Sequence, residues 1–211
     1  TLALRPPWRG CLDPVESLPL VGFVVAMVYT VSFDGFTDTP LFQTALFGAR
    51  NALGTGPGTS VLLYALGLVG FVVTFGAASR AVERLGAGSG RDWSTAARRF
   101  APTLLPIAAA YEVAHNYPYV LRSLGHLVVI ALRPVAPGVG PVDPLGGLSL
   151  PVFWGSQVAL IVLGHVVAVV AAHRVAVERY GSLSRARRGH LPLVVLMVGY
   201  TVLSLWIVSR P

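Results

Sequence analysis

Five long apolar runs restrict what this 211-residue chain can fold into. They cover about residues 18–36, 59–80, 101–132, 152–174 and 190–209. Each run has roughly the 20 residues that an α-helix needs to cross a hydrocarbon core about 30 Å thick. A chain in that core must satisfy its own backbone hydrogen bonds, and the runs are continuous rather than alternating, so we expect helices. The sequence therefore predicts an all-α fold, a polytopic transmembrane helical bundle with about five spans.

The composition agrees with a multi-pass protein of the cell membrane whose main partner is the lipid bilayer. Hydrophobic residues make up 54% of the chain and charged residues only 12%, whereas an average soluble domain carries about 25% charged residues. We expect residues 1–211 to form a single transmembrane domain. The chain starts with Thr and shows no cleavable leader ahead of the first run, so we expect a fragment of a longer membrane protein.

Arginine supplies all sixteen basic charges and is unevenly distributed among the loops. If successive loops alternate sides, one side collects twelve of them: Arg5, Arg9, Arg80, Arg84, Arg91, Arg98, Arg99, Arg174, Arg179, Arg185, Arg187 and Arg188. The other side holds Arg50, Arg122, Arg133 and Arg210. Cytoplasmic loops carry the excess of basic residues, so the N-terminus is expected in the cytoplasm. Basic residues beside spans are topology signals, and we expect no nucleic-acid partner.

Two connections on the arginine-poor side differ in character. Residues 136–151 are rich in Pro and Gly, which predicts an irregular or extended loop. The segment 39–53, TPLFQTALFGARNAL, fits either a short amphipathic helix at the membrane surface or a plain ordered loop. In the helical alternative, Phe42, Ala45 and Leu46 share one apolar side.

The stretch YEVAHNYPYV, residues 111–120, places polar groups inside the third run. At about 100° per residue, four of them fall on one side of a helix: Glu112, His115, Asn116 and Tyr119. An ionisable group within a span costs roughly 2.5–3.5 kcal/mol and normally faces protein or a water-filled cavity. We therefore expect this polar stripe to point into the bundle.

The fourth run contributes His165 and Gln157, and the first run ends near Asp34. Measured from the arginines at the cytoplasmic edge, Glu112 lies about 20 Å and His165 about 13–14 Å into the membrane. Helix tilt can absorb that difference. We expect Glu112 and His115 to face His165 across a helix interface, with Gln157 lining the same region. Asp34 is expected either to cap a turn or to line the outer mouth.

The chemistry of Glu112, His115 and His165 leaves several alternatives open. The three side chains together are a conceivable ligand set for a divalent metal such as Zn²⁺ or Cu. The two histidines are a less suitable haem pair, because axial ligands must meet at one depth. The same residues could instead pass a proton or a small substrate, or hold the helices together by hydrogen bonds alone.

Four segments resemble the C-terminal part of a family of polytopic membrane proteins from haloarchaea and actinobacteria. They are VSFDGF, APTLLPIAAAYEVAHNYPYVL, FWGSQVALIVLGHVVAVVAAH and HLPLVVLMVGYTVLSLWIVS. Members of that family are described as fenitrothion hydrolases, and they carry further spans upstream. The resemblance implies that those upstream spans, or a partner subunit, complete the bundle.

The resemblance also implies hydrolysis of an organophosphate triester by a metal-bound or base-activated water. Under that hypothesis His115 and His165 are metal ligands, and Glu112 is a ligand or the general base. Two alternative functions use the same residues. One is a permease or an ion- or proton-conducting membrane subunit, and the other is a haem-binding anchor for electron transfer.

Overall fold

A computed structural model describes residues 7–87 and 93–210 of the chain. Its elements, in chain order, are η1 (Pro7–Leu12), α1 (Leu18–Thr37), α2 (Pro40–Leu53), α3 (Gly58–Ala87), α4 (Trp93–Phe100), η2 (Ala101–Leu104), α5 (Leu105–Leu132), α6 (Leu150–Tyr180) and α7 (Leu183–Val208). All regular structure in these two ranges is helical, which confirms the predicted all-α class.

Proline and glycine mark several helix ends. Proline occupies the first turn of α1, α2, α5 and α6, where its missing N–H leaves no hydrogen bond unmade. The Thr39 hydroxyl caps α2 by accepting a hydrogen bond from the Phe42 N–H at 3.3 Å. Gly54 ends α2 and Gly181 ends α6, both with left-handed φ angles of 64° and 67° that favour glycine.

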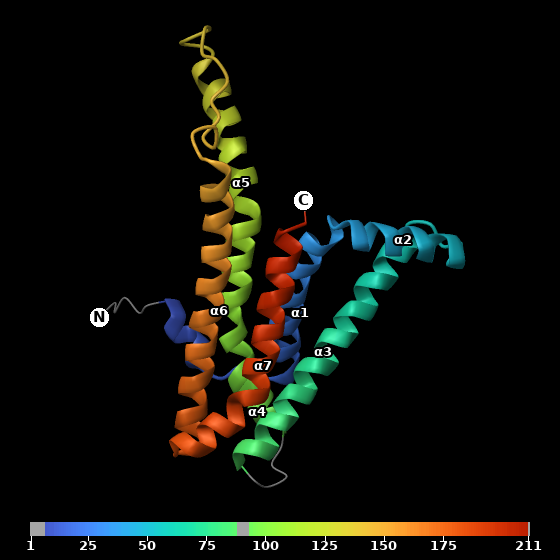
Figure 1. Cartoon of the computed structure of the whole chain (residues 1–211), viewed down its shortest axis with the longest axis vertical. Coiled ribbons are helices and arrows are strands. Elements are labelled where there is room, and N and C mark those ends of the chain that lie inside the picture. The colour runs from blue at the N-terminus through green and yellow to red at the C-terminus, as the bar shows by residue number, and fades with distance from the viewer. Residues whose placement is uncertain (1–6, 88–92, 211) are drawn as a thin grey trace.

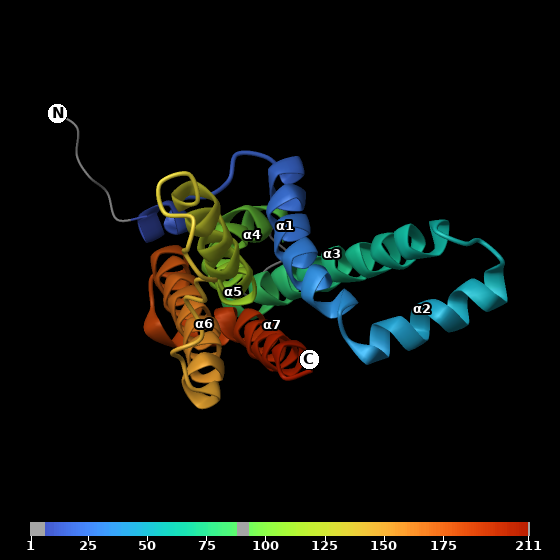
Figure 2. The same ribbon diagram turned by 90° about the horizontal axis from the view of Figure 1, so that it is seen from above.

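The long helices form a bundle in which α1, α5 and α7 run one way and α3 and α6 run the other (Figure 1). Helix α6 packs against α5 and α7, α7 also packs against α3, and α1 packs against α5 and α3. Helix α3 leans away from α7 toward the end where α2 lies, and α2 runs across that end (Figures 1 and 2). Helices α5 and α6 extend beyond the ends of α1 and α7 (Figure 1). The predicted irregular loop between them is present from residue 133 to residue 149.

Helix α2 confirms the helical alternative for the segment 39–53. Phe42 and Leu46 are buried against the bundle, whereas Leu41 and Phe47 are exposed. A helix with one buried apolar face, lying across the ends of the spans, suits the plane of the membrane interface.

Four of the described helices are long and apolar enough to cross a membrane: α1, α3, α6 and α7. The sequence predicted about five spans, and α5 is the one that does not qualify. Its 28 residues are long enough, but polar side chains interrupt its apolar sequence. Helix α5 packs along α6, which is a candidate span. A fifth crossing by α5 stays a prediction.

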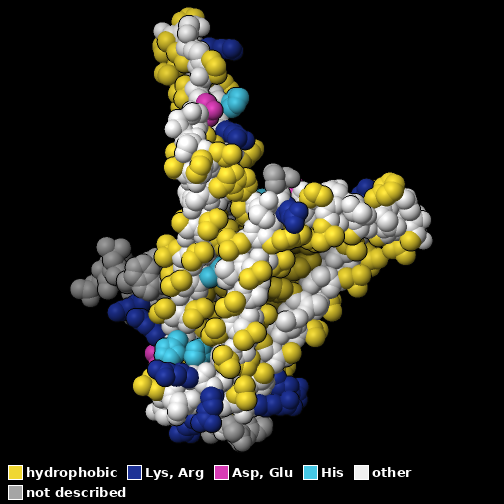
Figure 3. All heavy atoms as spheres, in the orientation of Figure 1, with side chains coloured by type: hydrophobic (Ala, Val, Ile, Leu, Met, Phe, Trp, Pro, Cys, Tyr) yellow, Lys and Arg dark blue, Asp and Glu magenta, His cyan; other side chains and the backbone are white. Residues whose placement is uncertain are grey.

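Most of the described arginines gather at the end of the bundle opposite α2 (Figure 3). This basic end contains the last turns of α3 and α6, helix α4 and the first turns of α7. Of the twelve arginines that the sequence assigns to one side, Arg5 and Arg91 lie outside the described residues. The cytoplasmic location of this end stays a prediction.

A buried ion pair holds α3 to α6 near the basic end. The Arg179 guanidinium on α6 donates a hydrogen bond to the Glu83 carboxylate on α3, and Glu83 is 2% exposed. Tyr180 packs beside this pair against Gly86 of α3 and Gly189 of α7, where a Cβ on either glycine would collide with its ring. Three helices therefore meet around one charged pair and one aromatic ring.

Replacing Glu83 by Ala should strongly destabilise the bundle. The substitution leaves the Arg179 charge buried without its carboxylate, which costs about 3–5 kcal/mol of unfolding free energy. Denaturant titration in detergent micelles, followed by circular dichroism, measures this loss. Glu178→Ala is the matched control, because Glu178 is an exposed glutamate on the same turn of α6. Equal losses in the two variants would show that the buried pair does not stabilise the fold.

Candidate functional site

A polar pocket lies between the middle of α5, the first turns of α6 and the C-terminal ends of α1 and α7, at the α2 end of the bundle. Its volume is about 300 Å³. The lining residues are Gly35, Asp38, His115, Phe153, Trp154, Gln157, Ile207, Val208 and Arg210. An acid, a histidine, an amide and a guanidinium thus come together from four helices or their ends. Such a concave site with a few convergent polar groups is typical of a ligand pocket.

His115 connects the pocket to two neighbours. Its Nε2 lies 3.8 Å from the Asp34 carboxylate of α1. Its ring stacks on Tyr111 one turn earlier in α5, with ring centroids 5.9 Å apart and planes 16° from parallel. Tyr111 fits because Gly35 faces it, and a Cβ at Gly35 would collide with the tyrosine hydroxyl. A glycine on α1 therefore lets α5 bring a buried tyrosine beneath the pocket.

Buried polar atoms continue from this pocket toward the middle of the bundle. Four of them lack a hydrogen-bond partner among the described residues: Tyr111 Oη, Gln157 Oε1, His165 Nε2 and Ser204 Oγ. They belong to α5, α6 and α7. Buried polar atoms in proteins are normally paired with protein or with ordered water. Four unpaired atoms on three adjoining helices are therefore best satisfied by water or by a polar solute.

His165 is held on α6 by contacts that leave one ring nitrogen without a partner among the described residues. Its Nδ1 lies 2.7 Å from the Ile161 carbonyl, so we assign the proton to Nδ1, which leaves Nε2 as an acceptor. The ring packs against Tyr200 of α7 at 5.9 Å between centroids. Gln157 and His165 are both buried on α6 and lie about 12 Å apart along the helix, at about 1.5 Å per residue. The polar side chains thus extend about two helical turns inward from the pocket.

The orientation of α5 differs from the predicted one. Glu112 and Tyr119 are exposed on the outside of the bundle, and Asn116 is only half-buried. The Asn116 amide donates a hydrogen bond to the Glu112 carboxylate at 3.1 Å. The face of α5 that packs inward carries Ile107, Ala108, Tyr111, Ala114, Pro118 and Gly125. The expectation that the whole stripe points inward is therefore corrected, and only His115 reaches the pocket.

The three expected metal ligands do not form one cluster. His115 lies beside Asp34, His165 packs on Tyr200, and Glu112 is exposed. Within residues 7–87 and 93–210, no group of three or more His, Cys, Asp or Glu side chains is arranged to hold a metal ion. The geometry likewise gives His115 and His165 different neighbours rather than a shared haem site. Gln157, by contrast, lines the pocket, and Asp34 lies next to it, beside His115.

Sequence reasoning missed several polar contacts of the site. Tyr111 and Arg210 were not proposed, although Tyr111 is one helical turn before His115, the spacing that brings two side chains together. Away from the pocket, the rings of His173 and His190 lie 5.0 Å apart between α6 and α7. No local pattern joins these two histidines, because the intervening turn determines which faces meet.

The fold and the pocket define a helical integral membrane protein with a polar site between its helices. The chain matches no protein-family model, and it shows no significant similarity to a curated protein or to a solved structure.

The polar pocket should be open to water, whereas the outer faces of its helices should not be. A Gln157→Cys variant should react with a charged, membrane-impermeant thiol reagent in reconstituted vesicles. The neighbouring Val158→Cys should not react, because Val158 is exposed on the outside of α6, where lipid suppresses ionisation of a thiol. Both variants are made in a Cys11→Ser background, since Cys11 is the one cysteine of the chain. Equal labelling of the two positions would contradict an aqueous pocket.

Proposed function

We propose that this membrane protein conducts protons, or a small polar solute, along the polar groups between α1, α5, α6 and α7. The observation that supports the proposal is the set of four buried, unpaired polar atoms that continues from the pocket. Ionisable and polar groups inside spans are expensive and commonly mark ion or proton pathways. Histidine, tyrosine and serine side chains can all donate and accept hydrogen bonds with bound water, which a chain of proton transfers requires.

Apolar side chains close the route toward the basic end. Beyond His165 and Tyr200, the interior is filled by buried residues such as Ile107, Leu193 and Met197. Among the described residues, the polar groups of the pocket therefore do not continue to the basic end. This arrangement corresponds to a transporter that is open on one side, which a change in helix packing could open on the other.

Proton flux into vesicles tests the proposal directly. Purified protein is reconstituted with an interior pH dye, and a potassium gradient with valinomycin supplies the driving force. His165→Leu should lower the flux by about tenfold or more, because proton transfer through a positioned side chain contributes at least this much. His126→Leu is the control, since His126 is exposed on the part of α5 beyond the other helices. Wild-type flux no greater than that of empty vesicles would contradict the proposal.

Hydrolysis of a phosphotriester is the second candidate function, and the pair of His115 with Asp34 favours it. A histidine 3.8 Å from a carboxylate, at the edge of a pocket of about 300 Å³, is suitably placed to accept a proton from an attacking water. Arg210 lines the same pocket and could stabilise charge on a phosphoryl oxygen. In this version His115 is the general base, whereas the family resemblance implies Glu112 as a metal ligand or the general base.

Release of a chromogenic leaving group from a phosphotriester measures this activity. His115→Gln should lower the rate by about a hundredfold, the typical contribution of a general base. Glu112→Gln should leave the rate unchanged, because Glu112 is exposed outside the pocket. An activity that depends on Glu112 but not on His115 would exclude the proposed assignment.

The exposed polar face of α5 supports the proposed contact with further membrane helices. Glu112 and Tyr119 lie on this face at or near the level of the pocket residue His115. An ionised carboxylate facing lipid costs roughly 2.5–3.5 kcal/mol, and protein contact removes that cost. Upstream spans of a longer protein, or a partner subunit, would cover this face.

A further inference from the structure

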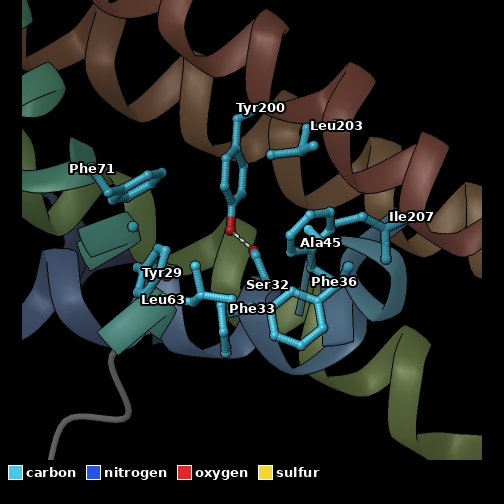
Figure 4. A pocket seen from close by; sticks show the side chains of 12 residues that line it. Tyr29, Ser32, Phe33, Phe36, Ala45, Leu63, Phe71, Tyr200, Leu203 and Ile207 are labelled. Carbon is cyan, nitrogen blue, oxygen red and sulfur yellow. Dashed lines mark hydrogen bonds between the residues drawn. The ribbon is translucent and has the colours of Figure 1, made fainter. Parts of the chain in front are cut away.

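A second cavity lies between α1, α2, α3 and α7, separate from the polar pocket. Its volume is about 320 Å³. Figure 4 shows the side chains around it, with Tyr29, Phe33 and Phe36 from α1, Phe71 from α3 and Tyr200 from α7 directed toward the same space. Figure 3 shows the corresponding hollow between α3 and α7, beneath α2, with hydrophobic side chains around it. The leaning of α3 away from α7 creates this space.

The polar groups that border the cavity are already paired. The Ser32 and Tyr200 hydroxyls hydrogen-bond to each other, and the Tyr200 hydroxyl also donates to the Val28 carbonyl at 2.9 Å. The Tyr29 hydroxyl donates to the Tyr64 carbonyl at 3.0 Å. A polar molecule in this cavity would lose its hydrogen bonds with water and gain few in return. The cavity therefore suits a hydrocarbon occupant, in contrast to the polar pocket.

The position and width of the cavity indicate what kind of hydrocarbon it accepts. Its walls belong to α1, α3 and α7, which are all apolar enough to cross a membrane, so it opens within the hydrocarbon layer. A transmembrane helix is about 10–12 Å across with its side chains and is too wide for a space of this volume. A lipid chain is narrow and is always available at this depth.

Charge at the α2 end indicates where the lipid headgroup would lie. Arg50 is exposed in the last turn of α2, and its guanidinium donates a hydrogen bond to Ser60 Oγ in the first turn of α3 at 3.3 Å. It lies about 7.5 Å along α2 from Ala45, which lines the cavity. A guanidinium at the membrane interface suits a phosphate group. We propose that the cavity binds an acyl chain of a phospholipid whose phosphate lies at Arg50.

Photolabelling locates such a lipid. The purified protein in detergent micelles is mixed with an anionic phospholipid that carries a photoreactive group in its acyl chain, and adducts are mapped by mass spectrometry after irradiation. Adducts should concentrate on the cavity residues Phe33, Phe71 and Leu203. Ala45→Phe places a ring in the cavity from α2 and should lower these adducts by about tenfold, because the ring occupies the space that the acyl chain needs.

Two control variants separate this site from general lipid contact. Ala65→Phe places the same side chain on the exposed face of α3, outside the cavity lining, and should leave the adducts unchanged. Arg50→Gln should lower the adducts of the anionic phospholipid by about fivefold, because one arginine near a surface is worth about 1 kcal/mol toward an anionic headgroup. The same variant should not affect a labelled long-chain alcohol that lacks the phosphate.

Three results would overturn the proposal. Adducts spread evenly over the exposed faces of α3 and α6 would show unspecific lipid contact only. Cross-links between two copies of the chain at Phe33 or Phe71 would show that a second copy covers the cavity. Equal labelling of the wild type and Arg50→Gln would exclude the phosphate contact. Elution of each variant at the wild-type volume in size-exclusion chromatography ensures that loss of labelling reflects binding rather than unfolding.

Discussion

Hydrocarbon offers no hydrogen-bond partners, and this constraint determines how every polar group of the bundle is placed. The backbone meets it by forming helices. Among side chains, Ser32 bonds with Tyr200, and Glu83 bonds with Arg179. Tyr111, Gln157, His165 and Ser204 each keep a buried atom without a partner among the described residues, and so do Glu83 and Arg179 for a second atom of their ion pair. Gln157 lines the polar pocket, which combines an acid, a histidine and an arginine. The proposed pathway rests on the four unpaired atoms between α5, α6 and α7.

The all-α class and the basic end followed from the sequence, because run length and arginine position depend on the membrane rather than on tertiary packing. The sequence predicted the helix boundaries less well. The last run was expected to begin near residue 190, whereas α7 begins at Leu183 and includes Arg185, Arg187 and Arg188. Helix α6 likewise continues to its cap at Gly181 and does not stop where its apolar run ends. Helical residues outside the hydrocarbon layer leave no apolar signal.

The candidate site was predicted only in part, since helical periodicity gives the relative direction of side chains but not the rotation of the helix. Glu112 and His115 were expected to share one inward-facing side, yet the face of α5 that packs inward depends on close contacts. Gly164 of α6 allows the approach of Ala110, and Gly35 of α1 accommodates Tyr111. These contacts favour a rotation that leaves Glu112 outside. No pattern within α5 alone could reveal which partner glycines would face it.

The angle between α3 and α7 determines the volume of the space between these two helices. Near the basic end α3 is fixed to α6 and α7 by the Glu83–Arg179 pair and by the contact of Gly86 with Gly189. Toward its other end α3 packs on α1, where the Tyr29 hydroxyl donates to the Tyr64 carbonyl, and is joined to α2. A tilt of α3 about the glycine contact would change the volume between α3 and α7. Bilayer thickness acts on helix tilt. The same sequence would thus hold a wider or narrower cavity in membranes of different thickness.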